Sequence, residues 1–526
     1  MDIGWDDLVG SALLWTERRR PGGVVGDAAE TAAGLLDAAA AGAVRRRAGL
    51  RPAVAGQRPT VAPEDRRAEL PPAARRRLET LLTDRAGGTS GNRRGSAPNL
   101  AELLPQWLAA AHREGYAAPP ETLPALLDAA RARTDLRADA LAFAGPRGRW
   151  LAGLNPDWKY ALRAGAGAVP GPDPEGREQA ERLWEEGLFA ERIALLSRLR
   201  LTGPATALAL LAATWKSERA EDRLMFVDSL RTGLSAADEP FLDQALSDRS
   251  RNVRATAAEL LSALPESALA ARMAARARSC ISLGPDGISV EAPYECDAAM
   301  ERDGVAPRPP NGRGERAWWL GQLVDAAPLA TWRARFGGRT PEQIIGLPVL
   351  DDWQPDLHAA WCRAAVRQRD TEWARALLGP PPAPSGPLGA VGDPAKLLSI
   401  LPGEERAEWV AAFIASHGLS EAFQMLGVCA VPWAAPLGRA VTDALDIARD
   451  AGSYPWSFSG VMGLAERCLD PASAEQVAAL ASAGEEPADG APGAAAYWGE
   501  AFQRLGSTLR LRAAMWDELR PAGGAG

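Results

Sequence analysis

Apolar side chains recur at steps of three and four along most of this chain, which places them on one face of an α-helix. One stretch near residue 100 has its apolar positions on a single stripe: Leu100, Leu103, Leu104, Trp107, Leu108 and Ala111. Pro, Gly and Arg residues interrupt this pattern between residues 1 and 162. We therefore predict an N-terminal helical domain over residues 1–162.

The periodic pattern is strongest between residues 178 and 280. Ser235 and Asp238 have the spacing of a capping box, and Pro204 stands where a helix would begin. Each predicted helix has one apolar stripe, which it cannot bury alone, so the helices must stack on their neighbours. We predict a helical array over residues 178–378 and further helical repeats over residues 394–526. Two Pro/Gly-rich stretches separate these segments.

One stretch breaks the helical pattern. In "CISLGPDGISVEAP" β-branched residues flank a "GPDG" turn, which predicts a small β-hairpin near residues 280–293. No repeat of fixed length is visible in the chain, so any array is irregular.

The segment "LSDRSRNVRATAAELLSALPES" carries the pattern D-x4-VR-x2-A-x2-LL-x2-L, which resembles the second helix of a HEAT-type repeat. In such repeats the Asp caps its helix and can reach an Arg of an adjacent unit. The resemblance implies that Arg254 serves the stack with Asp248, while Arg249 and Arg251 face solvent or a partner. The predicted fold class is all-α, an irregular HEAT-like α-α superhelix with a small inserted hairpin.

A broader resemblance covers much of the chain. The stretches "WDDLVGSALLWTERR", "GPRGRWLAGLNPDW" and "RDGVAPRPPNGRGERAWWLGQLV" look like an uncharacterised bacterial family catalogued only as a domain of unknown function. The resemblance implies a helical-repeat protein often encoded beside a MoxR-type AAA+ ATPase, a von Willebrand A domain protein and a SWIM zinc-finger protein. It brings no catalytic residues.

The composition of the chain argues against several classes of protein. The net charge of −8 over 526 residues argues against the chain as a whole being a nucleic-acid binder. The five cysteines are odd in number and widely spaced, which fits neither a disulfide framework nor a thiolate zinc site. The acidic N-terminus and the absence of a long apolar run predict a cytoplasmic protein without a membrane span.

Few residues of the chain indicate a catalytic or metal-binding site. His358 and Cys362 lie four residues apart and could present two metal ligands, but a helix with Trp361 in its core explains the same residues. The Gly/Arg-rich stretch 87–95 has neither the Lys nor the preceding strand of a phosphate-binding loop. We therefore expect no enzyme activity, cofactor or metal. An enzyme site assembled from scattered acids and His358 stays an open alternative.

Arginines are concentrated in residues 41–94, which contain 13 arginines and only 5 acidic residues. These clusters could form a patch for a polyanion, or they could be solvated helix faces, which we favour. Few aromatic residues accompany them, which weakens a single-stranded nucleic-acid interpretation. The residues of this possible patch are Arg45, Arg46, Arg47, Arg75, Arg76, Arg77, Arg93 and Arg94.

Tryptophan is also abundant, with 18 residues. Core packing explains most of them, but the adjacent pair Trp318 and Trp319 would point about 100° apart on a helix. If one faces the stack, the other can face a partner. The sequence thus predicts a non-enzymatic scaffold that binds a protein partner through Arg249, Arg251, Trp318 and Trp319. The family resemblance implies that this partner is the AAA+ ATPase or the von Willebrand A protein. The alternative is a polyanion-binding array that uses the arginines of 41–94.

Overall fold

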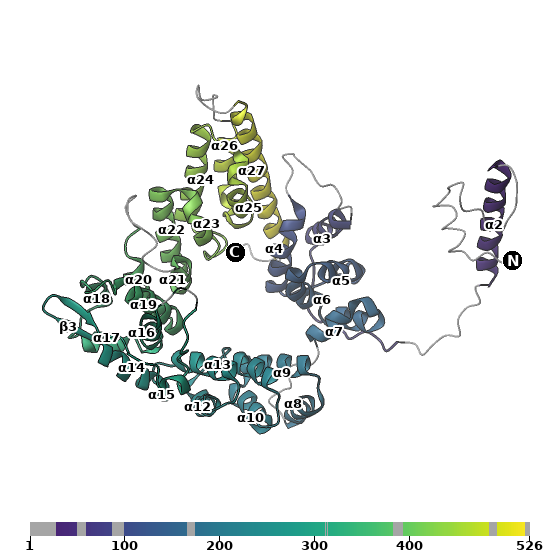
Figure 1. The fold of residues 1–526 in the computed structure, drawn as a ribbon. Helices are drawn as coiled ribbons and strands as arrows, with labels where there is room; N and C mark the ends of the chain where they lie inside the picture. The colour runs from purple at the N-terminus through teal and green to yellow at the C-terminus, as the bar shows by residue number, and fades with distance from the viewer. Residues whose placement is uncertain are drawn as a thin grey trace. The chain divides into compact units, whose positions relative to one another are not determined.

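The structure is a computed structural model that describes residues 28–49, 59–86, 99–165, 174–310, 312, 314–381, 393–482 and 492–520. Helices make up most of these residues, so the all-α prediction is confirmed (Figure 1). The chain divides into two compact units, residues 1–62 and 63–526. In the first unit the structure describes helix α2 (Ala28–Gly49). No helix among the described residues is both long and apolar enough to cross a bilayer.

The second unit begins with short helices around a small core. Its first elements are β1 (Ala68–Glu69), α3 (Pro72–Ala86), α4 (Leu100–Arg113), β2 (Tyr116–Ala117), η2 (Pro120–Thr122), α5 (Leu123–Ala132), η3 (Thr134–Leu136), α6 (Arg137–Leu154), η4 (Pro156–Trp158) and α7 (Lys159–Gly165). Strands β1 and β2 pair in parallel, which the sequence did not predict. The predicted stripe of α4 is the buried one, with Trp107 and Leu108 fully enclosed.

Helix α6 is kinked where Gly145 precedes Pro146. Gly145 has φ 59°, a conformation that favours glycine, and a Cβ there would lie 2.0 Å from Nη2 of Arg67. The Arg67 guanidinium donates to the carbonyls of Ala142 and Phe143 at 2.9 Å. Two carbonyls left open by the kink thereby gain a donor.

The array continues through helices that pack on their neighbours in sequence (Figure 1). Its middle part comprises α8 (Pro174–Glu186), α9 (Phe189–Thr202), α10 (Pro204–Thr214), α11 (Ala220–Ser229), η5 (Ala236–Asp238), α12 (Glu239–Ala245), α13 (Arg251–Ser262), α14 (Ala268–Cys280), α15 (Ala298–Arg302), α16 (Glu315–Ala326), α17 (Ala330–Arg335), α18 (Pro341–Ile345), α19 (Gln354–Gln368) and α20 (Thr371–Leu378). The predicted capping box exists, since the Ser235 amide donates to Asp238 Oδ2 at 2.9 Å.

The predicted hairpin is confirmed between α14 and α15. Strands β3 (Ile281–Gly284) and β4 (Gly287–Val290) pair antiparallel, with Ile281 opposite Val290. Ile288 also donates to the carbonyl of Pro348 at 2.8 Å, so the hairpin is tied to the segment after α18.

The last part comprises α21 (Pro394–Ile400), α22 (Gly403–His417), α23 (Leu419–Leu426), α24 (Ala435–Asp450), η7 (Pro455–Phe458), α25 (Ser459–Cys468), η8 (Pro471–Ser473), α26 (Ala474–Leu480) and α27 (Ala494–Leu519). One hydrophobic core runs from Ala180 to Leu509, so the predicted segments 178–378 and 394–526 share it. Met515 and Leu519 of α27 lie in the core of the N-terminal helices α3 to α6.

Ion pairs with little solvent exposure join successive parts of the array. Arg200 and Asp238 are the most enclosed pair, with side chains 0% and 2% exposed and Nη1 to Oδ1 at 2.8 Å. Similar pairs, some of them more exposed, are Arg192–Glu218, Arg223–Asp248, Arg231–Glu259, Arg272–Asp303 and Arg367–Asp325. Many arginines of this region therefore form ion pairs between packed helices, because a buried charge needs a partner.

Candidate functional site

Three aromatic rings form an exposed cluster where α24, η7 and α27 meet. Tyr454 and Trp456 stack with ring centroids 4.0 Å apart and planes at 16°, and Tyr497 meets Trp456 edge-on at 5.4 Å. Trp456 is 55% exposed and Tyr497 49% exposed. We call Tyr454, Trp456 and Tyr497 the aromatic cluster.

Neighbouring residues hold the aromatic cluster in place. Tyr454 donates its hydroxyl to the carbonyl of Pro492 at 3.2 Å. The ring of Trp498 is fully buried, and its indole N–H donates to the carbonyl of Ser453 at 2.6 Å. Because Trp498 anchors the start of α27 to the segment after α24, the adjacent Tyr497 is placed on the surface beside Trp456.

Apolar surface continues on helix α25. Gly460 follows Trp456 by four residues, and a Cβ on Gly460 would lie 3.1 Å from the ring of Phe423, which is 42% exposed. The small glycine thus allows the Phe423 ring to approach α25 closely. Single exposed apolar residues are ordinary, but rings in mutual contact make a larger apolar patch.

The aromatic cluster is suited to binding rather than to catalysis. Tryptophan and tyrosine dominate the energetic centres of protein interfaces, because a large rigid ring buries much area at a small cost in conformational entropy. Charged residues in the last turn of α24 are paired with one another, since Arg449 contacts Asp446 at 2.7 Å and Asp450 at 3.0 Å.

Sequence reasoning did not find this cluster. Tyr454 and Trp456 are close in sequence, but Tyr497 lies 43 positions after Tyr454. Only the packing of α27 on η7 and α25 brings it beside them.

The predicted partner residues lie in two places. Arg249 and Arg251 are exposed at the start of α13, and no ion pair to them occurs within the described residues. Trp319 is 7% exposed and donates to the carbonyl of Pro307 at 2.9 Å. Trp318 is half-buried and donates to the carbonyl of Ala306 at 2.8 Å. The chain itself already covers much of the tryptophan pair, whereas the two arginines are open to a partner.

Arg254 differs from its expected role in one respect. Its Nη1 donates to the backbone carbonyl of Asp248 at 2.7 Å, but the Asp248 carboxylate pairs with Arg223 of α11. The Asp248 side chain also accepts from the Ser250 amide at 2.8 Å, so it orders the turn into α13 and does not cap the helix, whose N-cap residue is Ser250.

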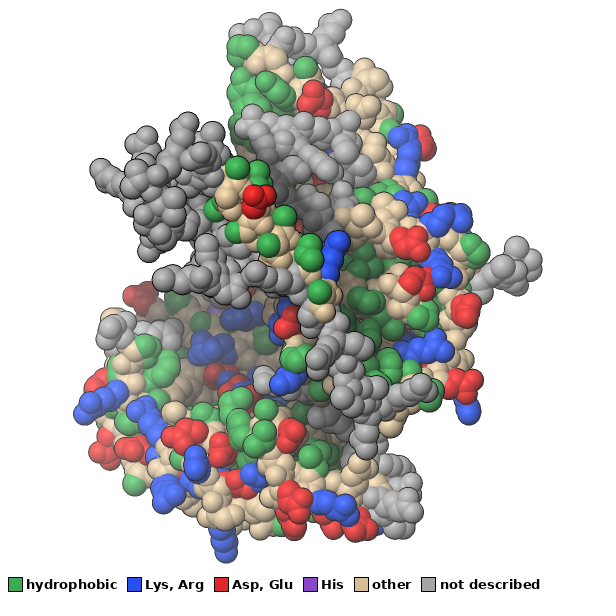
Figure 2. All heavy atoms as spheres, turned by 90° about the vertical axis from the view of Figure 1, so that its right-hand side faces the viewer, with side chains coloured by type: hydrophobic (Ala, Val, Ile, Leu, Met, Phe, Trp, Pro, Cys, Tyr) green, Lys and Arg blue, Asp and Glu red, His purple; other side chains and the backbone are tan. Residues whose placement is uncertain are grey.

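The arginines of 41–94 lie in both units and partly outside the described residues. Arg77 pairs with Glu518 at 2.8 Å and Arg75 pairs with Glu121, while Arg76 is exposed. Arg45, Arg46 and Arg47 belong to α2 in the other unit, where Arg47 is exposed. Arg93, Arg94 and the stretch 87–95 lie outside the described residues. On the face in Figure 2, the described basic and acidic side chains are interspersed rather than separated.

His358 and Cys362 lie on α19 in a setting that disfavours metal binding. Burial raises the pKa of the Cys362 thiol to about 12, whereas a metal ligand must be a thiolate. Burial also lowers the pKa of His358, whose ring lies 5.7 Å from that of Trp361. Trp361 is fully buried, as the core interpretation of this helix predicted. Among the described residues, no group of three or more His, Cys, Asp or Glu side chains is arranged to hold a metal ion.

Comparison with known proteins leaves the activity open. No curated protein and no solved structure matches the chain. A family model described as "Family of unknown function (DUF5691)" matches residues 7–519, which is nearly the whole sequence. The chain therefore belongs to this family of unknown function.

Proposed function

We propose that this protein is a non-enzymatic helical-repeat scaffold that binds a protein partner. The exposed aromatic cluster carries this proposal, because Trp456 and Tyr497 offer half of their ring surface to solvent while neighbouring contacts hold them in place. A rigid aromatic surface of this kind loses little conformational entropy on binding.

The use of charge in the array supports a protein partner over a polyanion. Arg200, Arg223 and Arg77 pair with carboxylates of the chain, so these guanidinium groups are not available to phosphates. A continuous basic surface would be needed for a nucleic-acid backbone. The polyanion alternative then rests on the arginines of α2 and those around Arg76.

The family resemblance in the sequence suggests which partners to test first. A MoxR-type AAA+ ATPase and a von Willebrand A domain protein are the candidates. The proposed role is presentation of a large surface to such a partner in the cytoplasm, with Arg249 and Arg251 as further contacts.

Tagged purification from the native cell, followed by mass spectrometry at low and high salt, tests this function. The wild type is compared with Trp456→Ala/Tyr497→Ala and with a control double variant, Leu188→Ala/Leu201→Ala. Leu188 and Leu201 are 73% and 74% exposed, so the control also removes exposed apolar surface. Circular dichroism establishes that all three proteins are folded.

We expect a protein partner that survives high salt with the wild type and the control. The aromatic double variant should lose it, because truncating one central interface aromatic costs about 2 kcal/mol or more. Equal recovery with all three proteins would refute the aromatic cluster as the binding surface. Recovery of nucleic acid that high salt removes, with no protein, would refute the scaffold and favour the polyanion alternative.

A further inference from the structure

A cleft of about 330 Å³ lies beside the β3–β4 hairpin, between α14, α15, α16 and the segment 291–297. Its base is apolar and is formed by Cys280, Ala292, Met300 and Leu323, each of which is at least nine-tenths buried. Its rim carries the exposed carboxylates of Glu291, Glu295 and Asp297. The cleft therefore combines an apolar floor with an acidic edge.

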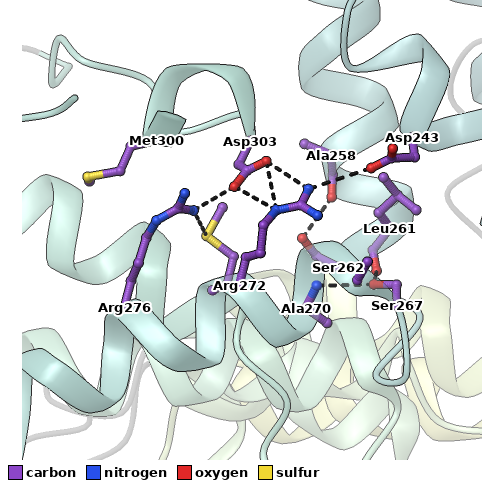
Figure 3. A network of polar contacts seen from close by, with 12 residues as sticks. Asp243, Ala258, Leu261, Ser262, Ser267, Ala270, Arg272, Arg276, Met300 and Asp303 are labelled. Carbon is purple, nitrogen blue, oxygen red and sulfur yellow. Dashed lines mark hydrogen bonds and ion pairs between the residues drawn. The ribbon is translucent and has the colours of Figure 1, made fainter. Parts of the chain in front are cut away.

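One wall of the cleft is basic, but its charge is already neutralised. Arg276 Nη1 lies 2.7 Å from Oδ2 of Asp303, and Arg272 Nη2 lies 2.8 Å from Oδ1 of the same carboxylate (Figure 3). Asp303 is 2% exposed, and Asp243 lies 3.6 Å from Arg272 on the far side. The two arginines and two aspartates offset one another, so this wall adds little net charge to the cleft.

The opposite side of the cleft is held by main-chain contacts. The Glu291 amide donates to the carbonyl of Cys280 at 2.8 Å. Arg316 donates to the carbonyls of Ala292 at 2.5 Å and Pro293 at 3.2 Å. Its guanidinium also lies 4.4 Å from the ring centroid of Tyr294, which is 75% exposed. These contacts hold the rim segment in place.

The rim carboxylates can accept further hydrogen bonds or ion pairs. Within the part of the chain that the structure describes, neither Glu291 nor Glu295 forms an ion pair, and Asp297 accepts one hydrogen bond from the Met300 amide at 2.7 Å. Burial raises the pKa of the nearby Cys296 thiol, Glu301 and Asp297 raise it further, and Arg276 lowers it.

We infer that this cleft binds an arginine or lysine side chain from a basic segment of a protein partner. Such a side chain has an aliphatic stem for the apolar base and a cationic head for the carboxylates at the rim. A wholly apolar ligand would leave the carboxylates without partners, and an anionic ligand would be repelled by them. The inference rests on the proposed function, because the ligand is part of the proposed partner.

A labelled peptide tests the cleft without the natural partner. Fluorescein-labelled tetra-arginine is titrated into the full chain at physiological ionic strength, with tetra-glutamate as the opposite-charge probe, and anisotropy is recorded. The test variant is Glu291→Gln/Glu295→Gln, and the control is Glu185→Gln/Glu186→Gln on α8. Both doubles remove two exposed negative charges, so they change the net charge equally.

We expect saturable binding of tetra-arginine and none of tetra-glutamate, with about fivefold weaker binding in the Glu291/Glu295 variant only. Equal weakening by the two doubles would mean attraction to net charge alone and would overturn the inference. Absence of saturable binding to the wild type would overturn it as well.

A second arm separates this inference from the proposed function. The variant Trp456→Ala/Tyr497→Ala should bind tetra-arginine as the wild type does, because these rings are not part of the cleft. If the Glu291/Glu295 variant still captures the natural partner at full strength, the cleft is refuted as a partner site while the scaffold stands. If neither the wild type nor any variant captures a partner, the scaffold proposal is refuted. The peptide titration still tests whether the cleft binds a cationic side chain.

Discussion

Arg223 of α11 and Asp248, which precedes α13, form an ion pair that links α11 to the start of α13. The Nε and Oδ2 atoms lie 2.8 Å apart, Nη2 donates to Oδ1 at 3.0 Å, and the side chains are 5% and 7% exposed. The carboxylate also accepts from the Ser250 amide at 2.8 Å, in the turn that leads into α13. One acidic side chain therefore orders the turn before α13 and binds α11, which packs against α13.

This pair should matter more for stability than the contact made by Arg254. Replacement of Asp248 by Asn leaves the Arg223 guanidinium buried without a counter-charge, which costs about 3 kcal/mol. Replacement of Arg254 by Ala removes hydrogen bonds to two backbone carbonyls and should cost about 1 kcal/mol. Urea unfolding and hydrogen exchange of α11 and α13 measure the difference. A larger loss for Arg254→Ala would contradict this assignment of roles.

Helix α27 should stabilise the N-terminal helices. Met515 is 1% exposed in the core that α3 and α4 form, and Glu518 pairs with Arg77. Met515→Ala should therefore speed hydrogen exchange in α3 and α4, at a cost of about 3 kcal/mol. Arg520→Ala is the control, because this side chain is 76% exposed. Faster exchange confined to α27 would show that the shared core contributes little.

Stability should depend on pH through His358. Burial lowers the pKa of His358 below its ordinary 6.5, so the unfolded chain takes up a proton at higher pH than the folded chain. This residue's contribution is therefore present above pH 6.5 and is lost as pH falls toward the folded-state pKa. His358→Gln removes that dependence, so the urea midpoint of the variant should fall less than that of the wild type between about pH 7.5 and 5.5. Exposed His112→Gln serves as the control, and parallel curves for the wild type and the His358 variant would refute the effect.

The cysteines should differ in reactivity toward a thiol reagent. Burial raises the pKa of Cys362 to about 12 and that of Cys429 to about 11, so the thiolate is scarce at both sites. Burial raises the pKa of Cys296 and Cys468 as well, but both side chains are only half-buried, so the reagent can reach them. Iodoacetamide treatment of the native protein, mapped by mass spectrometry, should label Cys296 and Cys468 before Cys362 and Cys429. Early labelling of Cys362 would mean that α19 opens readily.

Local features were readable from the sequence. The apolar stripe of α4, the capping box of Ser235 and Asp238 and the β3–β4 hairpin were all predicted, because each depends on residues close together in the chain. The partners of individual side chains were harder to predict from the sequence. The sequence motif suggested Arg254 for Asp248, but Arg223, 25 positions earlier, takes the carboxylate because α11 packs against α13.

The sequence by itself determined an all-α chain of amphipathic helices with one hairpin, because helical periodicity and turn chemistry act over a few residues. Only the tertiary structure decided that Tyr497 joins Tyr454 and Trp456, that Glu291 and Arg276 line one cleft, and that Met515 completes the core of α3 and α4. These contacts depend on how helices distant in sequence pack, and many packings satisfy the same apolar pattern until side-chain shape and charge pairing select one.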